Sequence, residues 1–290
     1  MIGASQRRTD LPHGLAKADH VAMKILRTLV HLSDLHIGRD DRSLECARAL
    51  VDNVVEAGID HVVVSGDITH RGRKAELDLY LSLFEPIADR LTTVPGNHDR
   101  LGDDIAAELM DDRRVRVTRT HGTYLIAVDS TGEHNRRYSF AGHGSLDADD
   151  LQQLDAALDA APPTDLVVVT MHHHPVPLPE ESTAERLATF FGLPYAAELP
   201  LGPELLRCLR GRCDLLLHGH RHVPRSLQMF EHTERPLQLF NAGSSTGMGR
   251  ARVFTHGAGS LASDPFWLHA DGHAALPVMP MMPAAAAGLD

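Results

Sequence analysis

Short apolar runs alternate with longer amphipathic segments in the first hundred residues of the chain. Residues 25–33 and 61–65 are apolar and rich in β-branched side chains, which predicts two buried strands. Between them, the apolar positions of residues 43–57 recur at helical spacing. A second helix is predicted over residues 74–90, followed by a strand at 91–94. Strand–helix–strand units of this kind are typical of βαβ folds and predict a parallel sheet.

The second half of the chain continues this alternation of strands and helices, but no helix is predicted after residue 217. The pattern predicts strands at 124–129, 166–171 and 214–217, and a helix at 147–160 with an acidic first turn. Later apolar runs are short, and we expect them to pair as antiparallel strands: 223–230, 237–242, 251–256 and 265–269. The chain is therefore expected to be an α/β protein with a β-rich C-terminal part.

The pattern also predicts how the chain is divided. Residues 1–22 are polar and poorly patterned, so we expect a flexible N-terminal arm or a start codon assigned too far upstream. Residues 23–276 are expected to form a single domain, and residues 277–290 a disordered low-complexity tail. Within the domain, the proline-rich stretch 175–203 is either a surface loop with a short helix or a lid or dimerisation arm.

Composition and charge narrow the function classes. The 290 residues suffice for one large α/β domain, and no apolar run reaches the 18 residues that suggest a membrane span. The net charge of −11 disfavours duplex DNA as a partner, because an acidic protein gains little from counterion release. It does not disfavour a phosphate substrate, since bound cations would reverse the local field.

Histidine and cysteine counts point to a metal site in a reducing compartment. Histidine is abundant, with 20 residues, and many of them fall in a few short stretches. The three cysteines, an odd number at wide spacing, resemble neither a disulfide framework nor a zinc knuckle. A cytoplasmic location fits best.

Five short stretches each follow a predicted strand and carry metal-ligand side chains: 34–36, 66–67, 96–99, 172–174 and 219–222. Gly-Asn-His-Asp and Gly-His-x-His are the more specific motifs, whereas Asp-x-His also arises by chance or as a helix cap and Gly-Asp is a common turn. Oxygen and nitrogen ligands without thiolate suit a pair of divalent cations such as Mn, Fe, Zn, Co or Ni, and paired cations attack phosphate esters. The candidate ligands are Asp34, His36, Asp67, Asn97, His172, His220 and His222.

The order of the five motifs resembles the calcineurin-like metallophosphoesterase superfamily. The match runs from about residue 29 to residue 222 and is loosely nearest the bacterial cyclic-nucleotide phosphodiesterase group, through His31-Leu-Ser-Asp-Leu-His36 and Gly66-Asp-Ile-Thr69. The resemblance implies a four-layer α/β/β/α sandwich of two facing mixed sheets.

The resemblance also assigns ligands. One metal would take Asp34, His36 and His222, the other would take Asn97, His172 and His220, and Asp67 would bridge them. The fourth motif is ambiguous because residues 172–174 are all histidine. We expect His172 to ligate, because in this superfamily the residue directly after the strand usually does so.

Further residues are candidates for catalysis or substrate binding. His98 resembles the histidine that protonates the leaving oxygen or stabilises the transition state. Asp99 either orients His98 or caps the next helix. Arg39, Arg71 and His173, with His70 beside them, would contact the substrate phosphate, although solvated loop charge also explains the arginines.

These assignments predict a metal-dependent phosphoesterase. A metal-bridging hydroxide would hydrolyse a phosphodiester, such as a cyclic nucleotide, or a phosphomonoester of a small molecule. The alternatives are a nuclease or a nucleotide or lipid pyrophosphatase of the same superfamily. A non-catalytic interaction module is disfavoured, because such relatives usually lose ligands that this chain keeps. A homodimer is a further candidate assembly.

Overall fold

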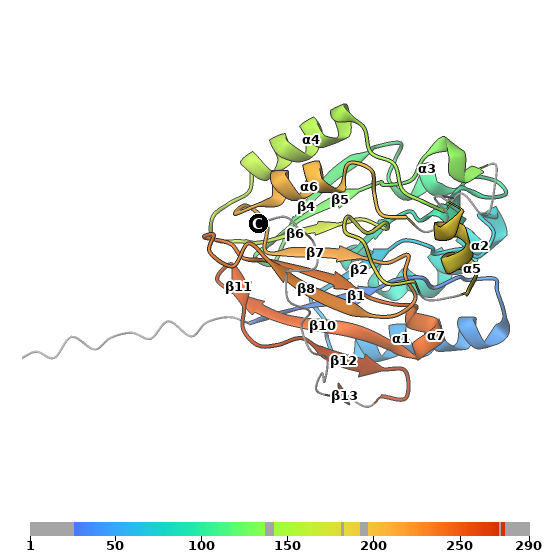
Figure 1. Ribbon diagram of the computed structural model, residues 1–290. Helices are drawn as coiled ribbons and strands as arrows, with labels where there is room; N and C mark the ends of the chain where they lie inside the picture. Colours follow the sequence, from blue (N-terminus) through green and yellow to red (C-terminus); the bar gives the residue numbers. More distant parts are fainter. Residues whose placement is uncertain (1–25, 137–141, 181–182, 192–196, 273, 276–290) are drawn as a thin grey trace, which may run out of the picture.

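Two mixed β-sheets form the framework of the computed structural model (Figure 1). It describes residues 26–136, 142–180, 183–191, 197–272 and 274–275. The expected arm at 1–22 and tail at 277–290 lie outside these ranges, and the single domain at 23–276 stays a prediction. None of the described helices has the length and apolarity needed to cross a membrane.

The first sheet combines early and late strands of the chain. β1 pairs in parallel with β2 and β2 with β3, whereas β10 joins the other side of β1 in antiparallel orientation. Its order is β13 (Ala274–Ala275), β12 (Phe266–His269), β10 (Arg250–Gly257), β1 (Arg27–Leu32), β2 (His61–Ser65) and β3 (Leu91–Val94), with β11 (Ser260–Leu261) beside β10.

The second sheet has a parallel centre and antiparallel edges. Its order is β4 (Val115–Thr120), β5 (Thr123–Val128), β6 (Leu166–Thr170), β7 (Leu215–His218), β9 (Leu237–Asn241) and β8 (Arg225–Met229). We expected the late strands to pair only as antiparallel neighbours, and this is wrong for β9. β9 lies parallel to β7, because the β8 hairpin returns the chain to the sheet in the same direction.

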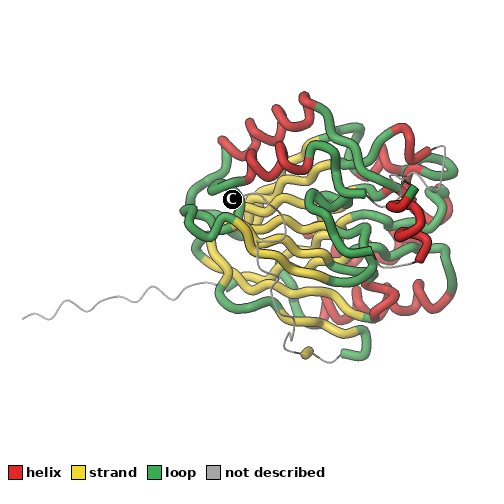
Figure 2. Tube along the Cα trace, in the orientation of Figure 1, coloured by secondary structure: helices red, strands yellow, loops and turns green. Residues whose placement is uncertain are grey.

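Helices cover the outer face of each sheet (Figure 2). α1 (Asp41–Glu56) and α2 (Lys74–Phe84) share an apolar core with the first sheet, and α4 (Ala148–Asp159) and α6 (Gly202–Leu209) share one with the second. The remaining helical segments are short: η1 (Glu85–Arg90), η2 (Asn97–Arg100), α3 (Ala106–Leu109), η3 (Glu133–Arg136), α5 (Thr183–Phe190) and α7 (Ser245–Met248).

A third core lies between the sheets. Leu29, Val63 and Phe254 of the first sheet pack with residues of the second, including Val168 and Leu217. Since side chains alternate along a strand, each sheet buries one face against its helices and the other against its partner sheet. The expected α/β/β/α sandwich of two mixed sheets is therefore confirmed.

Some boundaries differ from the sequence pattern for local reasons. α1 starts two residues before the predicted start at 43, because the Asp40 carboxylate accepts a 2.7 Å hydrogen bond from the Ser43 amide. The helix predicted over 74–90 ends as an α-helix at Phe84 and continues as the 3-10 helix η1, where Pro86 lacks the amide hydrogen that an α-helix needs.

His61 on β2 makes the stability of the metal-free protein depend on pH. It is 4% exposed, and its Nε2 lies 2.9 Å from Thr92 Oγ1. Burial, and then the nearby His121, lower the pKa of His61 to about 4. Its folded pKa lies below its unfolded value of about 6.5, so its contribution to stability is complete above that pH and is lost as the pH falls toward 4.

We therefore expect the free energy of unfolding of metal-stripped protein to fall between pH 7 and pH 4.5. In His61→Gln the fall should be smaller by about 2 kcal/mol. Urea denaturation at the two pH values measures it, with His232→Gln, at an exposed histidine, as the control. Equal pH dependence in wild type and His61→Gln would contradict the prediction.

Candidate metal centre

The loops after β1, β2, β6 and β7 bring most of the predicted ligands to one edge of the two sheets. The Asp34 amide donates to the Gly66 carbonyl at 3.0 Å, and the His36 amide donates to the Asp67 carbonyl at 3.0 Å, so the first two loops run side by side. Four of the predicted ligands, Asp34, His36, Asp67 and His220, have positive φ angles between 48° and 68°. Such left-handed backbone is uncommon for non-glycine residues and tends to cluster at functional sites.

Asp34, His36 and His222 form the first group of ligand atoms. One ligand atom from each lies within 4.8 Å of the others. His36 Nε2 is 3.5 Å from His222 Nε2, and His222 Nε2 is 3.5 Å from Asp34 Oδ1. Asp34 and His36 are buried, whereas the His222 side chain is 55% exposed, so this group opens to solvent at His222.

Asn97, His172 and His220 form the second group. His220 Nδ1 lies 3.1 Å from Asn97 Oδ1, and the His172 and His220 rings meet edge to face with centroids 5.2 Å apart. These residues come from η2 and from the loops after β6 and β7, so both sheets contribute. Burial, and then His173, lower the pKa of His220 well below its usual range, which leaves a neutral ring suited to ligation.

Asp67 lies between the two groups. Its Oδ2 is 3.9 Å from His36 Nε2 in the first group, and its Oδ1 is 3.4 Å from His172 Nε2 in the second. The side chain is buried, and its Oδ1 also accepts a 2.9 Å hydrogen bond from the His98 amide. One carboxylate oxygen therefore faces each group, an arrangement in which Asp67 could contact two cations.

The choice between His172 and His173 follows from their hydrogen bonds. His173 uses both ring nitrogens: Nε2 donates to the Gly142 carbonyl at 2.9 Å, and Nδ1 accepts from the Ser130 hydroxyl at 2.8 Å. The Nδ1 of His172 donates to the Ser65 carbonyl at 2.8 Å, and its Nε2 faces another predicted ligand, Asp67, at 3.4 Å. This supports His172 as the ligand and leaves His173 as a residue that packs behind it rather than a phosphate contact.

Buried polar atoms without hydrogen bonds test whether cations fit here. Among the described residues, Asp34 Oδ1 and His172 Nε2 are buried and have no hydrogen-bond partner, and the groups nearest to them are other predicted ligands, His222 and Asp67. Burial alone would lower the pKa of His172, but the Asp67 carboxylate raises it to about 9, so metal-free protein pairs a protonated His172 with Asp67. Divalent cations would take the place of that proton and occupy the orphaned atoms, so the residues fit a pair of metals.

His98 stands at the open side of the site. Its Nδ1 donates to the backbone carbonyl of His70 at 2.8 Å, which places the remaining nitrogen, Nε2, at the other end of the ring. The ring lies 4.7 Å from that of His36, centroid to centroid, and is only partly buried. His98 is thus held beside the first ligand group with one nitrogen free.

Asp99 does not orient His98. Its carboxylate accepts backbone hydrogen bonds from Gly96, Ile68 and Thr69 and a 2.7 Å bond from the Thr69 hydroxyl. Burial, and then the charge of Asp67, raise the pKa of Asp99 to about 6 despite these bonds. The orienting role that we expected is therefore corrected: Asp99 ties the second and third ligand loops together, and the His70 carbonyl holds the His98 ring.

Two glycines permit the close approach of these loops. Gly66 has φ +94°, and a Cβ there would lie 2.4 Å from His172 Nδ1. A Cβ at Gly96 would lie 2.2 Å from Asp67 Oδ1. Any side chain at either position would push a predicted ligand away, which explains the glycines directly before Asp67 and Asn97.

Two residues outside the predicted ligand set support the ligand loops, and Ser130 is the one that sequence reasoning missed. Ser130 accepts hydrogen bonds from the amides of His172 and His173 at 3.2 and 3.1 Å, and Asn241 Nδ2 donates to the Gly219 carbonyl at 3.0 Å. Ser130 also follows a strand end, β5, and that position is the signal that could have found it. Asn241 begins the segment Asn241-Ala-Gly-Ser-Ser245, which resembles a segment that follows the last motif in this superfamily, and its hydrogen-bond partner lies 22 residues away in the sequence.

Arg39 and Arg71, which were predicted to contact the substrate phosphate, lie outside the two ligand groups. Arg39 Nη2 donates to Ser43 at 2.8 Å and its Nε pairs with Asp40 at 3.1 Å, so its charge serves the start of α1. Arg71 is exposed, and its contact with substrate stays a prediction.

The 175–203 stretch carries α5, at whose end Phe190 and Phe191 are 81% and 68% exposed. Its role as lid or dimer arm also stays a prediction.

Comparisons with known proteins agree with the geometry. A sequence model of calcineurin-like phosphoesterases matches residues 27–224. The cAMP/cGMP dual specificity phosphodiesterase MT0825 of Mycobacterium tuberculosis (strain CDC 1551 / Oshkosh) is 28% identical, over 72% of this chain and 65% of that protein. The 3',5'-cyclic adenosine monophosphate phosphodiesterase CpdA of Pseudomonas aeruginosa is 29% identical, over 75% of each chain. This chain thus spans about two thirds to three quarters of these relatives.

Solved structures share the fold. A purple acid phosphatase, PPD1, from yellow lupin (Lupinus luteus) seeds superposes with a TM-score of 0.63 at 13% identity, over 87% of this chain and 53% of that chain. A dimetal phosphatase from Danio rerio gives a TM-score of 0.60 at 14% identity, over 84% of this chain and 98% of that chain. At these identities the likeness establishes the fold alone.

Proposed function

This chain belongs to the calcineurin-like phosphoesterase family, and we propose that it is a dinuclear metal-dependent phosphodiesterase that hydrolyses small phosphate esters, cyclic nucleotides first among them. The observation that carries the proposal is Asp67, whose two carboxylate oxygens face two separate groups of ligand atoms. The relatives named as cyclic-nucleotide phosphodiesterases support the substrate class.

The residues that would hold each metal follow from the two groups. Asp34, His36 and His222 would hold one cation, Asn97, His172 and His220 would hold the other, and Asp67 would contact both. Bound together, two such cations supply Lewis acidity, which lowers the pKa of water and neutralises charge on the phosphate. The oxygen and nitrogen donor set accepts Mn, Fe, Zn, Co or Ni.

His98 would act on the leaving group. Its Nδ1–H is committed to the His70 carbonyl, so proton donation or a hydrogen bond to the ester oxygen would come from Nε2. The phosphate would enter from the open side of the site, where His222 is exposed and His70 and His98 are partly buried. Burial of Asp34, Asp67 and His172 keeps the opposite side dry, which strengthens electrostatic interactions there.

Compartment and assembly are part of the proposal. Cys46, Cys208 and Cys213 are free thiols, which supports the reducing cytoplasm that the sequence suggested. The exposed apolar residues at the end of α5 make it the candidate contact of a homodimer.

A substrate panel with controlled metal content tests the function. Metal-stripped protein should be inactive, and Mn²⁺ should restore hydrolysis of bis-p-nitrophenyl phosphate and cyclic nucleotides above that of p-nitrophenyl phosphate. Faster cleavage of single-stranded DNA would indicate the nuclease alternative, and preference for p-nitrophenyl phosphate would indicate a phosphomonoesterase. No turnover with any of the five metals would refute the enzyme assignment.

A further inference from the structure

The segment between β9 and β10, residues 242–249, crosses from the second sheet to the first beside the metal centre. β9 ends at Asn241 next to the end of β7, and β10 begins at Arg250 next to the end of β1. The short helix α7 lies within this segment, and its N-cap, Ser244, accepts a 3.2 Å hydrogen bond from the Gly247 amide. The segment therefore passes the two strand ends that lead into the first and last ligand loops.

Ser244 contacts two ligands of the same predicted cation. Its amide donates to the His222 carbonyl at 3.2 Å, and its hydroxyl donates to the Asp34 carbonyl at 3.0 Å. Asp34 and His222 are far apart in the sequence and follow strands of different sheets. Ser244 is 6% exposed, so water does not readily replace either bond. One residue thus connects both ends of the first ligand group.

The next two residues of the segment bind the same ligand loop. The Ser245 amide donates to the Ser33 carbonyl at 2.9 Å, and the Ser245 hydroxyl accepts from the Ser33 amide at 3.0 Å. The Thr246 hydroxyl donates to the Leu35 carbonyl at 2.9 Å and lies 3.5 Å from the carbonyl oxygen of Asp34. Three successive residues of the segment therefore hold three successive residues at the end of β1.

The first ligand loop needs this support because its backbone is strained. Asp34 has a φ of 52° and His36 a φ of 48°, and non-glycine residues keep such angles only where surrounding contacts impose them. The second ligand group has a support of its own, in which the His172 amide donates to Ser130 Oγ at 3.2 Å. Two buried hydroxyls, those of Ser244 and Ser130, thus hold loops of different ligand groups.

We propose that Ser244 is a positioning residue of the first metal site, which fixes Asp34 and His222 relative to each other and so sets how tightly the first cation is held relative to the second. The inference rests on the proposed function in one respect, the assignment of two cations to the two ligand groups. A residue that holds ligands in place before a cation binds reduces the ordering that binding requires. Loss of such a partner typically weakens metal binding by about tenfold to a hundredfold.

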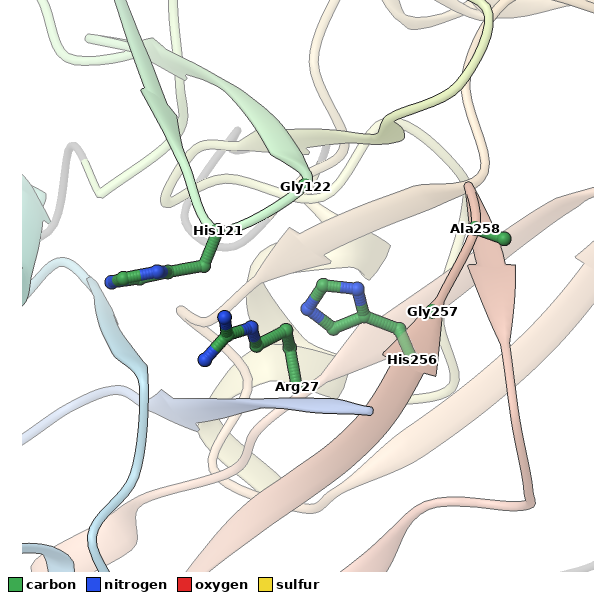
Figure 3. A pocket seen from close by; sticks show the side chains of 6 residues that line it. All are labelled: Arg27, His121, Gly122, His256, Gly257 and Ala258. Atoms are coloured by element: carbon green, nitrogen blue, oxygen red, sulfur yellow. The ribbon is translucent and has the colours of Figure 1, made fainter. Parts of the chain in front are cut away.

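The opposite end of the sandwich supplies a matched control. There, His256 Nε2 of β10 lies 3.1 Å from Thr123 Oγ1 of β5, so a buried hydroxyl joins the two sheets. Figure 3 shows His256 at this end, where it lines a pocket together with Arg27. Arg27 begins β1 and Asp34 follows its end, so extended chain of roughly 20 Å separates this contact from the ligand loop. Thr123→Val and Thr246→Val therefore remove similar buried hydroxyls at opposite ends.

A Zn²⁺ titration of metal-stripped protein against a competing chelator tests the proposal, with the histidine ring nitrogens followed by NMR. Zn²⁺ has no unpaired electrons, so the His36 ring reports the first cation and the His172 ring the second in one sample. Ser244→Ala should lower the affinity at His36 relative to that at His172 by about tenfold to a hundredfold. Thr246→Val should change this ratio in the same direction, and Ser130→Ala in the opposite direction.

A merely structural effect would weaken both cations together and leave the ratio unchanged, as expected for Thr123→Val. The proposal is overturned if Ser244→Ala leaves the ratio unchanged or if Thr123→Val changes it as much. If Ser244→Ala does not fold, Thr246→Val decides by the same criterion. Turnover with an unchanged ratio would overturn this proposal alone, whereas zinc binding at both rings without turnover would overturn the proposed function alone. Zinc that shifts neither ring would overturn both.

Discussion

Replacing Asp67 with asparagine should remove nearly all hydrolysis and at least one of the two metals. The amide of the variant would offer one good oxygen donor where the carboxylate offers two, and it would not balance the charge of two cations. With several kcal/mol of charge stabilisation lost, we expect kcat to fall by at least about a thousandfold. Rates on bis-p-nitrophenyl phosphate and the metal content per chain, by mass spectrometry, are the measurements.

A second readout tests the bridging geometry itself. In metal-free protein the Asp67 carboxylate raises the pKa of His172 to about 9, so metal binding at neutral pH should release that proton. In Asp67→Asn the raising charge is absent, the pKa of His172 should fall, and proton release on metal binding should decrease. Asp111→Asn, at a carboxylate 75% exposed, is the control. Two tightly bound metals and normal rates in Asp67→Asn would refute the bridging role.

The ligand residues were predictable because they follow strands, and strands are visible as apolar runs. Asp34, Asp67 and His172 each follow such a run directly, or after a single residue, and the βα order places their loops at one edge. The sequence could not show which ring nitrogens of His172 and His173 take part in hydrogen bonds. The hydrogen bonds that orient the His172 ring and engage the His173 ring involve Ser65, at the end of β2, and Ser130, two residues after β5.

β4 and α6 are not predicted from the sequence, for a similar reason. β4, with the sequence Val-Arg-Val-Thr-Arg-Thr, is a half-exposed edge strand whose charged residues conceal its alternation. α6 begins with Gly202-Pro203 at the end of a proline-rich stretch, so no helix is predicted over its residues from the pattern alone. In both cases the element is stabilised by its neighbours in the fold rather than by its own pattern.

Asp99 shows why a motif alone can mislead about a role. It is adjacent to His98 in the sequence, yet its carboxylate accepts hydrogen bonds from the loop that contains Thr69. Successive residues of a tight turn point in different directions, so adjacency does not bring the two side chains together. The His98 ring takes its orientation from a backbone carbonyl instead, which no sequence motif specifies.

His98→Gln should lower kcat by about a hundredfold to ten-thousandfold without changing the metal content. His98 is not in either of the two ligand groups, so loss of its ring removes a proton donor and leaves the cations in place. The size of the loss should depend on the leaving group. A p-nitrophenolate ion leaves readily without protonation, whereas an alkoxide does not, so the loss should be larger for an alkyl ester or a cyclic nucleotide.

This dependence separates the two roles considered for His98. If the ring only stabilises charge on the phosphate, the loss will be the same for both kinds of leaving group. If it donates a proton, the losses will diverge, with the larger loss for the poor leaving groups. His232→Gln serves as the surface control. Unchanged rates in His98→Gln on every substrate would exclude a catalytic role for this residue and would leave the two metals as the source of the rate.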